Sequence, residues 1–191
     1  MSIIVATNNA GKLAELQTAS TIPVVSYTAY LPPVAISETS TTYFGNALKK
    51  AGTLAELLQR PVLGDDGGLA LGAFPGKLGV HTARFFPPGA SDQAKNRQLL
   101  ELLEQQDDRS FTLHAVLVYC WPDGRKLSAA ETLTGVIAPE SRGVGGYGFD
   151  PILYIPDKKQ TLAEMQAAER LALSPRTRAF QALLRRIADV S

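Results

Sequence analysis

Strand-like and helix-like patterns alternate along this chain, and the first change comes within its first twelve residues. Ile3 to Ala6 is a run rich in β-branched residues that stops at the polar segment Thr7-Asn8-Asn9-Ala10-Gly11-Lys12. Leu13, Leu16 and Ala19 then recur at helical spacing. This order predicts a strand, a tight polar loop and a helix.

The clearest helix pattern opens after Thr42 and stops before Pro61, because proline cannot continue a helix. Its apolar residues recur at i, i+3, i+4 and i+7 and are expected to face the core: Phe44, Ala47, Leu48, Ala51, Leu54, Ala55 and Leu58. Asn46, Lys49 and Lys50 lie off that apolar stripe.

Further elements of both kinds follow. Strands are predicted at 61–64, 111–121, 126–138 and 152–155, with the second and third joined by a hairpin turn at Pro122-Asp123-Gly124. Helices are predicted after Ser91, over 161–173 and from Ser174 onward, and the second of these opens on a Thr161–Glu164 capping box. Residues 72–90 hold many Gly and Pro and are expected to be rich in loops. This mixture predicts an α/β fold with a mixed β-sheet and flanking helices. With no repeat or long linker, we expect one domain over residues 1–191.

Charge and composition exclude several classes of protein. The net charge of +1 argues against a nucleic-acid-binding protein that relies on a strong positive field. No apolar run approaches the ~20 residues of a membrane span, and no signal peptide opens the chain, so we expect a cytoplasmic protein with no membrane partner. Cys120 is the only cysteine and lies in an apolar run, which favours a buried structural thiol.

The loop from Thr7 to Lys12 is a candidate anion site. A loop between a strand and a helix directs backbone N–H groups at one spot, at the positive end of the helix dipole, and Lys12 adds a charge there. Such a site suits a polyphosphate, although the pattern is not that of a P-loop. An ordinary capped helix is the alternative for this segment.

Asp65 and Asp66 follow a short apolar strand and precede two glycines. In an extended chain their side chains point to opposite faces, so only one of them can face a given ligand. Mg²⁺ needs few carboxylates, and Glu38 plus one of these aspartates would suffice. A solvated Asp-Gly turn is the alternative.

Gly145 to Pro151 combines flexible backbone with Tyr147, Phe149 and Asp150. Aromatic faces stack on nucleobases, and a carboxylate can hydrogen-bond to a base edge, so this segment is a candidate base site. The alternative is a bulged loop whose aromatic side chains belong to the core. Arg176 and Arg178, taken alone, read as solvated charges.

Six segments in a fixed order carry more information than any one of them: residues 5–12, 38–47, 65–69, 79–84, 145–151 and 174–176. This pattern resembles the inosine triphosphate pyrophosphatase family, which removes deaminated purine nucleoside triphosphates, over residues 3 to 184. The resemblance implies a long central mixed sheet, two lobes enclosing a nucleotide cleft, and a homodimer.

The resemblance also implies roles for individual residues. Phosphate binding falls to Lys50 and to the first loop, whose members are Thr7, Asn8, Asn9, Ala10, Gly11 and Lys12. Glu38 and Asp66 match ligands of Mg²⁺, and Asp66 matches the general base. Base binding falls to Gly67, Tyr147, Gly148, Phe149, Asp150, Arg170, Pro175 and Arg176, of which Arg176 matches an arginine that recognises the purine carbonyl at position 6.

Four positions depart from the family pattern. Gly45 stands where the family often has Glu, Gly67 where it has Ser, Arg170 where it has Lys, and Pro175 where it has His. The groups for metal and phosphate are therefore intact, whereas the groups for the base are altered. A missing hydrogen bond to a base edge can cost a few kcal/mol of discrimination.

We therefore expect hydrolysis of ITP, dITP or XTP to monophosphate and pyrophosphate, by attack of water on the α-phosphorus. One alternative is a nucleotide pyrophosphatase with another or a relaxed base preference. The other is a catalytically silent nucleotide-binding protein; four residues argue against it, namely Glu38, Asp66, Lys12 and Lys50.

Overall fold

The computed structural model describes residues 2–189, and the chain folds into two compact units. The first unit comprises residues up to Gly67, Ala115–Glu131 and the segment from Pro175 onward, and the second comprises Gly68–His114 and Thr132–Ser174. The chain thus passes between the units several times. The two lobes implied by the resemblance agree with this division, while the nucleotide cleft stays a prediction.

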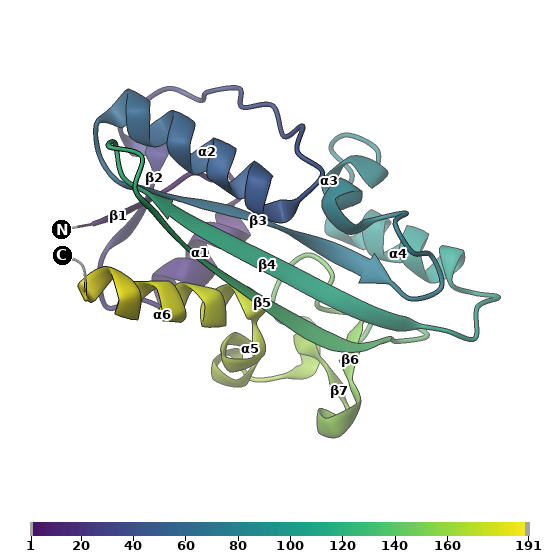
Figure 1. Ribbon diagram of the computed structural model, residues 1–191. Helices are drawn as coiled ribbons and strands as arrows, with labels where there is room; N and C mark the ends of the chain where they lie inside the picture. The colour runs from purple at the N-terminus through teal and green to yellow at the C-terminus, as the bar shows by residue number, and fades with distance from the viewer. Residues whose placement is uncertain (1, 190–191) are drawn as a thin grey trace. The chain divides into compact units, whose positions relative to one another are not determined.

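The strands form one mixed sheet in the order β2-β1-β3-β4-β5-β6-β7 (Figure 1). Strand β1 (Ile3–Val5) pairs in parallel with β2 (Val24–Ser26) and with β3 (Val62–Leu71), whereas β6 (Leu153–Ile155) pairs antiparallel with β5 (Lys126–Ile137) and with β7 (Gln160–Thr161). Strand β4 spans Ser110–Cys120. The predicted α/β class with a mixed sheet is confirmed.

The first unit is a three-layered sandwich of α1 (Ala10–Thr18), α2 (Tyr43–Leu58) and α6 (Pro175–Ala188) around its strands. Alternate residues of β1 face opposite sides: Ile3 and Val5 pack with α1 and α6, whereas Ile4 packs with α2. Figure 1 shows α2 and α6 on opposite sides of these strands. The 3₁₀ turn Tyr27–Ala29 follows β2.

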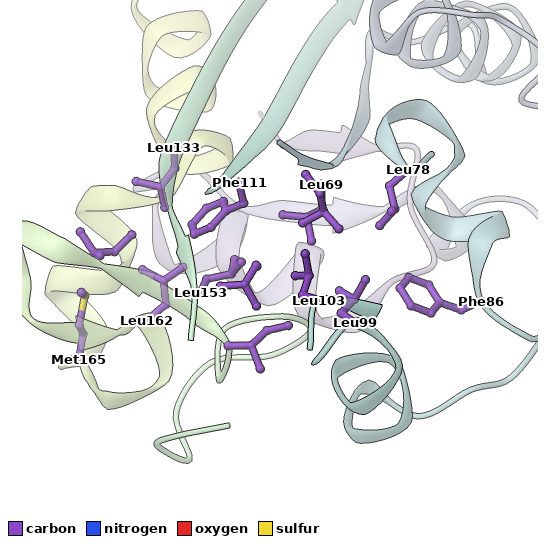
Figure 2. Packing of buried hydrophobic residues seen from close by; sticks show 14 residues of the cluster. Leu69, Leu78, Phe86, Leu99, Leu103, Phe111, Leu133, Leu153, Leu162 and Met165 are labelled. Atoms are coloured by element: carbon purple, nitrogen blue, oxygen red, sulfur yellow. The ribbon is translucent and has the colours of Figure 1, made fainter. Parts of the chain in front are cut away.

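The second unit has an apolar core of its own (Figure 2). Leu69, Phe111 and Leu153 come from strands, and Leu99 and Leu103 come from α4 (Asp92–Leu102) and its C-cap. The remaining short elements of this unit are α3 (Thr82–Phe85), α5 (Ala167–Leu173) and 3₁₀ turns at Gly79–His81, Pro156–Lys158 and Leu162–Glu164. Within residues 2–189, no helix combines the length and apolar character needed to cross a membrane.

Three local predictions were wrong. The strand predicted to stop at Gly64 continues to Leu71. The Thr161–Glu164 capping box is present, but it caps a 3₁₀ turn, and the α-helix starts only at Ala167. On α2, Phe44 is 40% exposed whereas Asn46, predicted to lie off the apolar face, is fully buried. The hairpin, the helix from Ser91 and the buried Cys120 are confirmed.

Candidate active site

Asp65 and Asp66 lie on β3 and face opposite sides of the strand, as their adjacent positions predicted. Asp66 faces α2, where Asn46 Nδ2 donates to its Oδ2 at 3.2 Å. Asp65 faces α1 and α6, where it contacts Lys12 and Arg176. Both side chains are buried or nearly so. The strand thus separates two groups of charged residues within the first unit.

The group around Asp66 centres on Lys50. Lys50 Nζ lies 2.9 Å from Glu38 Oε1 and 3.4 Å from Asp66 Oδ1, and the lysine side chain is only 12% exposed. Burial opposes the charged form of Lys50, but the charge of Asp66 and the hydrogen bond with Glu38 outweigh it and raise the lysine pKa. For Asp66, burial disfavours the charged carboxylate and raises its pKa. The positive charge of Lys50 and the hydrogen bond from Asn46 offset only part of this rise.

Glu38 and Asp66 are suited to a magnesium ion by their chemistry and placement. Both present carboxylate oxygens to the same small cationic group, the ammonium of Lys50. Mg²⁺ prefers oxygen donors and keeps several waters, so two carboxylates are an adequate donor set. Among residues 2–189 there is no cluster of three or more His, Cys, Asp and Glu that could hold a metal ion. Glu38 and Asp66 would therefore supply two carboxylates to an Mg²⁺ ion that keeps several water ligands.

The group around Asp65 links three elements of the first unit. Asp65 Oδ2 lies 3.0 Å from Lys12 Nζ on α1 and 3.0 Å from Arg176 Nε on α6. The positive charges of Arg176 and Lys12 outweigh the effect of burial and hold the pKa of Asp65 well below its usual range. Arg176 Nη1 also donates to Glu15 at 2.9 Å. Arg176 is thus 14% exposed and doubly paired, not solvated.

The loop between β1 and α1 is ordered by its own side chains. Asn9 caps α1 by accepting a hydrogen bond from Lys12 N at 3.0 Å, and Thr7 Oγ1 accepts one from Asn9 N at 3.1 Å. Asn8 Nδ2 donates to the Tyr27 hydroxyl at 3.2 Å. Asn8, Asn9 and Ala10 are exposed, and Gly11 is partly so. An anion could therefore reach this helix N-terminus, where backbone N–H groups and Lys12 supply positive charge.

The predicted base segment, Tyr147 to Asp150, lies in the second unit. Asp150 Oδ2 accepts a hydrogen bond from Tyr147 N at 3.0 Å and lies 3.8 Å from Arg170 Nε. Phe149 packs against the core ring of Phe86, with centroids 5.7 Å apart. Phe149 is therefore packed against the core, as the alternative interpretation of this segment predicted.

Two of the departures from the family pattern have a local explanation. A Cβ atom at Gly45 would overlap Ser40 Oγ, so a larger residue would require the segment before α2 to move. Pro175 is buried at the first position of α6, where its missing N–H costs nothing. Gly67 is part of β3 and Arg170 part of α5, and nothing in their contacts explains their departure from the family residues.

Sequence reasoning missed two members of these groups, Asn46 and Glu15. Asn46 precedes Lys50 by one helical turn, and Glu15 follows Lys12 by one turn. Each therefore shares a helix face with a residue that was predicted. This spacing was the signal that could have found them.

Comparisons with known proteins give one consistent result. The model of the Ham1 family matches residues 3–186. The dITP/XTP pyrophosphatase of Desulforamulus reducens is 38% identical over 186 residues, which cover 95% of this chain and 92% of that protein. The dITP/XTP pyrophosphatase of Geobacter sulfurreducens is 35% identical, with 95% and 94% covered.

Solved structures agree with the sequence matches. The Ham1 protein of Staphylococcus aureus superposes with a TM-score of 0.88 at 29% identity over 100% of both chains. The HAM1 protein of Coxiella burnetii superposes with a TM-score of 0.87 at 32% identity over 99% of both chains. On the strength of its sequence and its fold, this chain belongs to the Ham1 family.

Proposed function

We propose that this chain hydrolyses deaminated purine nucleoside triphosphates, namely dITP, XTP and ITP, to the monophosphate and pyrophosphate. Membership of the Ham1 family and full-length relatives named dITP/XTP pyrophosphatase support this reaction. The observation that carries the proposal is the group around Asp66. A buried carboxylate, a second carboxylate and a lysine meet there, in the same compact unit as the loop of Lys12.

In the proposed reaction, the exposed loop and Lys12 bind phosphate oxygens through N–H groups and one positive charge. Asp66 accepts a proton from the water that attacks the α-phosphorus, and Asn46 holds its carboxylate in place. Lys50 stabilises negative charge on the leaving pyrophosphate. Glu38 and Asp66 would hold Mg²⁺, whose chemistry here is to neutralise charge on the phosphate oxygens.

Base recognition in this proposal falls to the segment from Tyr147 to Asp150, with Gly67, Arg170, Pro175 and Arg176 as further contributors. Pro175 offers no side-chain donor, which favours a relaxed base preference as the second candidate function. The proposal also includes a homodimer, dependence on Mg²⁺ and a cytoplasmic location.

The test is pyrophosphate release from a panel of dITP, XTP, ITP, dATP, dGTP and UTP, with and without Mg²⁺. Asp66→Asn serves as the inactive control. Release from the deaminated purines only when Mg²⁺ is present supports the proposal. Equal turnover of every purine would favour the relaxed enzyme instead, and failure to hydrolyse any nucleotide would overturn both.

A further inference from the structure

Gly148 has both of its main-chain polar groups bound by side chains of α4. Its N–H donates to Asp92 Oδ2 at 2.8 Å, and its carbonyl accepts from Asn96 Nδ2 at 3.0 Å. Asp92 and Asn96 are four residues apart, so they project from the same face of the helix. All three residues belong to the second unit, although more than fifty residues separate Gly148 from each partner.

Asn96 occupies a place where a polar side chain is costly. The residue is 3% exposed, and its Oδ1 is buried without a hydrogen-bond partner. An unpaired buried polar atom destabilises a fold, and an apolar side chain would avoid that cost. The amide orientation follows from its partner, because a carbonyl oxygen can only accept and so must face the NH₂ group. The contribution of the buried Asn96 amide to the structure is therefore its hydrogen bond to Gly148.

The neighbours of Gly148 are also fixed. Tyr147 N donates to Asp150 Oδ2, and Phe149 packs on Phe86. Gly148 has a φ of +64°, in the left-handed region that glycine adopts without strain. With Asp92 and Asn96, these contacts hold every residue of the segment from Tyr147 to Asp150 before any ligand binds. A binding segment that is ordered in advance loses less entropy on binding and discriminates better between ligands.

We propose that Asp92 and Asn96 are positioning residues for base recognition. By holding both peptide groups of Gly148, they keep the aromatic rings and the carboxylate of the segment in the arrangement that distinguishes hypoxanthine from guanine. In this proposal both residues act through Gly148 and not by contact with the nucleotide. The proposal rests on the proposed function, because it takes this segment to be the part that reads the base.

Asn96 donates its hydrogen bond to Gly148, whereas Asp92 accepts one from it. Variants that change the donor or the acceptor therefore test the two bonds separately. Asn96→Asp replaces the donor by a carboxylate facing the Gly148 carbonyl and should reduce the ITP-to-GTP ratio of kcat/KM by about 10-fold or more. Asp92→Ala removes an acceptor at an exposed position and should reduce it by about 3-fold. Asp92→Asn keeps an acceptor oxygen, so its ITP-to-GTP ratio should lie closer to that of the unaltered protein than the ratio of Asp92→Ala does. Gln93→Ala, at an exposed position on the same helix, is the matched control and should leave the ratio unchanged.

The expected loss lies in KM for ITP rather than in kcat, with inhibition by pyrophosphate unchanged, because the phosphate loop belongs to the other unit. A fall in melting temperature with an unchanged ITP-to-GTP ratio would show that Asp92 and Asn96 are only structural and would overturn the proposal. Equal effects of Asp92→Asn and Asp92→Ala would overturn it too, since charge rather than hydrogen bonding would then be responsible.

Binding measurements separate this inference from the proposed function. Dissociation constants of IMP and GMP, measured by calorimetry, require no turnover. If no triphosphate is hydrolysed, the proposed function fails, yet the IMP-to-GMP affinity ratio of the Asp92 and Asn96 variants still decides the positioning role. Because Asp92 is exposed, its variants keep the test valid even if Asn96→Asp does not fold.

Discussion

Lys50 lies where a divalent cation is proposed to bind, so replacing it should strengthen metal binding while weakening catalysis. Its ammonium contacts both Glu38 and Asp66. A cation that binds these carboxylates must first displace the ammonium from them. Lys50→Met removes the charge and keeps a long unbranched side chain, and therefore removes the competitor with little change in packing.

The expected gain in metal affinity follows from the two ion pairs that Lys50 makes. At the value of an exposed ion pair, roughly 0.5–1 kcal/mol, the two pairs together oppose the metal by at least about 1–2 kcal/mol, because the Lys50–Asp66 pair is mostly buried. This corresponds to a metal dissociation constant about 5- to 30-fold lower in Lys50→Met than in the unaltered protein. Pyrophosphate release should fall in the same variant, because the positive charge on the leaving group's side is lost.

Calorimetric titration with Mn²⁺ in the absence of nucleotide measures the effect directly. Lys49→Met is the matched control, because Lys49 is the adjacent lysine and its ammonium donates to Thr39 Oγ1 at 3.3 Å instead. Its Mn²⁺ affinity should stay close to that of the unaltered protein. Unchanged or weaker Mn²⁺ binding by Lys50→Met would refute the competition between the ammonium and the metal.

Three further substitutions test other parts of the site. Asp66→Asn should lower kcat about 100-fold or more, and Asp65→Asn should lower it less; equal losses in steady-state assays would reverse their roles. Asp65→Asn should instead lower the free energy of unfolding by about 3 kcal/mol in urea titrations, because Lys12 and Arg176 lose a buried partner. The control is Glu131→Gln, which breaks the exposed pair of Glu131 with Arg178; a loss for Asp65→Asn as small as that of the control would contradict this. Pro175→His should raise the ITP-to-GTP ratio of kcat/KM about 10-fold, and an unchanged ratio would show that position 175 does not read the base.

The placement of Asp65 and Asp66 was predictable because it depends only on the two-residue period of an extended chain. Their positions on opposite faces of β3 follow from that period whatever the rest of the fold does. The apolar spacing of α2 likewise identifies most of its buried face, since Ala47, Ala51, Leu54 and Ala55 are buried, although Phe44 is 40% exposed. Local geometry was enough for these features.

The extension of β3 was not predictable from local preference. Gly67 and Gly68 read as a turn, but pairing within the sheet carries the strand through them to Leu71. A Cβ atom at Gly68 would overlap the carbonyl oxygen of Gly79. Glycine is thus required there by the close approach of another backbone segment, which the sequence alone does not reveal.

Buried polar residues were missed for a related reason. Asn46 lies off the apolar stripe of α2 and was expected to be away from the core, yet it is buried because Asp66, twenty residues later, accepts its hydrogen bond. Glu15 pairs with Arg176 across more than 160 positions of the chain. Such partners become neighbours only in the folded protein. Helical spacing places Asn46 beside Lys50 and Glu15 beside Lys12, but it does not identify Asp66 or Arg176 as their partners.

The roles proposed for Asp66, Lys50 and Glu38 all depend on attack of water at the α-phosphorus. Hydrolysis of dITP in ¹⁸O-labelled water, followed by mass spectrometry of both products, identifies the phosphorus that is attacked. We expect one ¹⁸O atom in dIMP and none in pyrophosphate. Label in pyrophosphate, or formation of labelled orthophosphate with dIDP, would mean attack on the β- or γ-phosphorus and would rule out these roles.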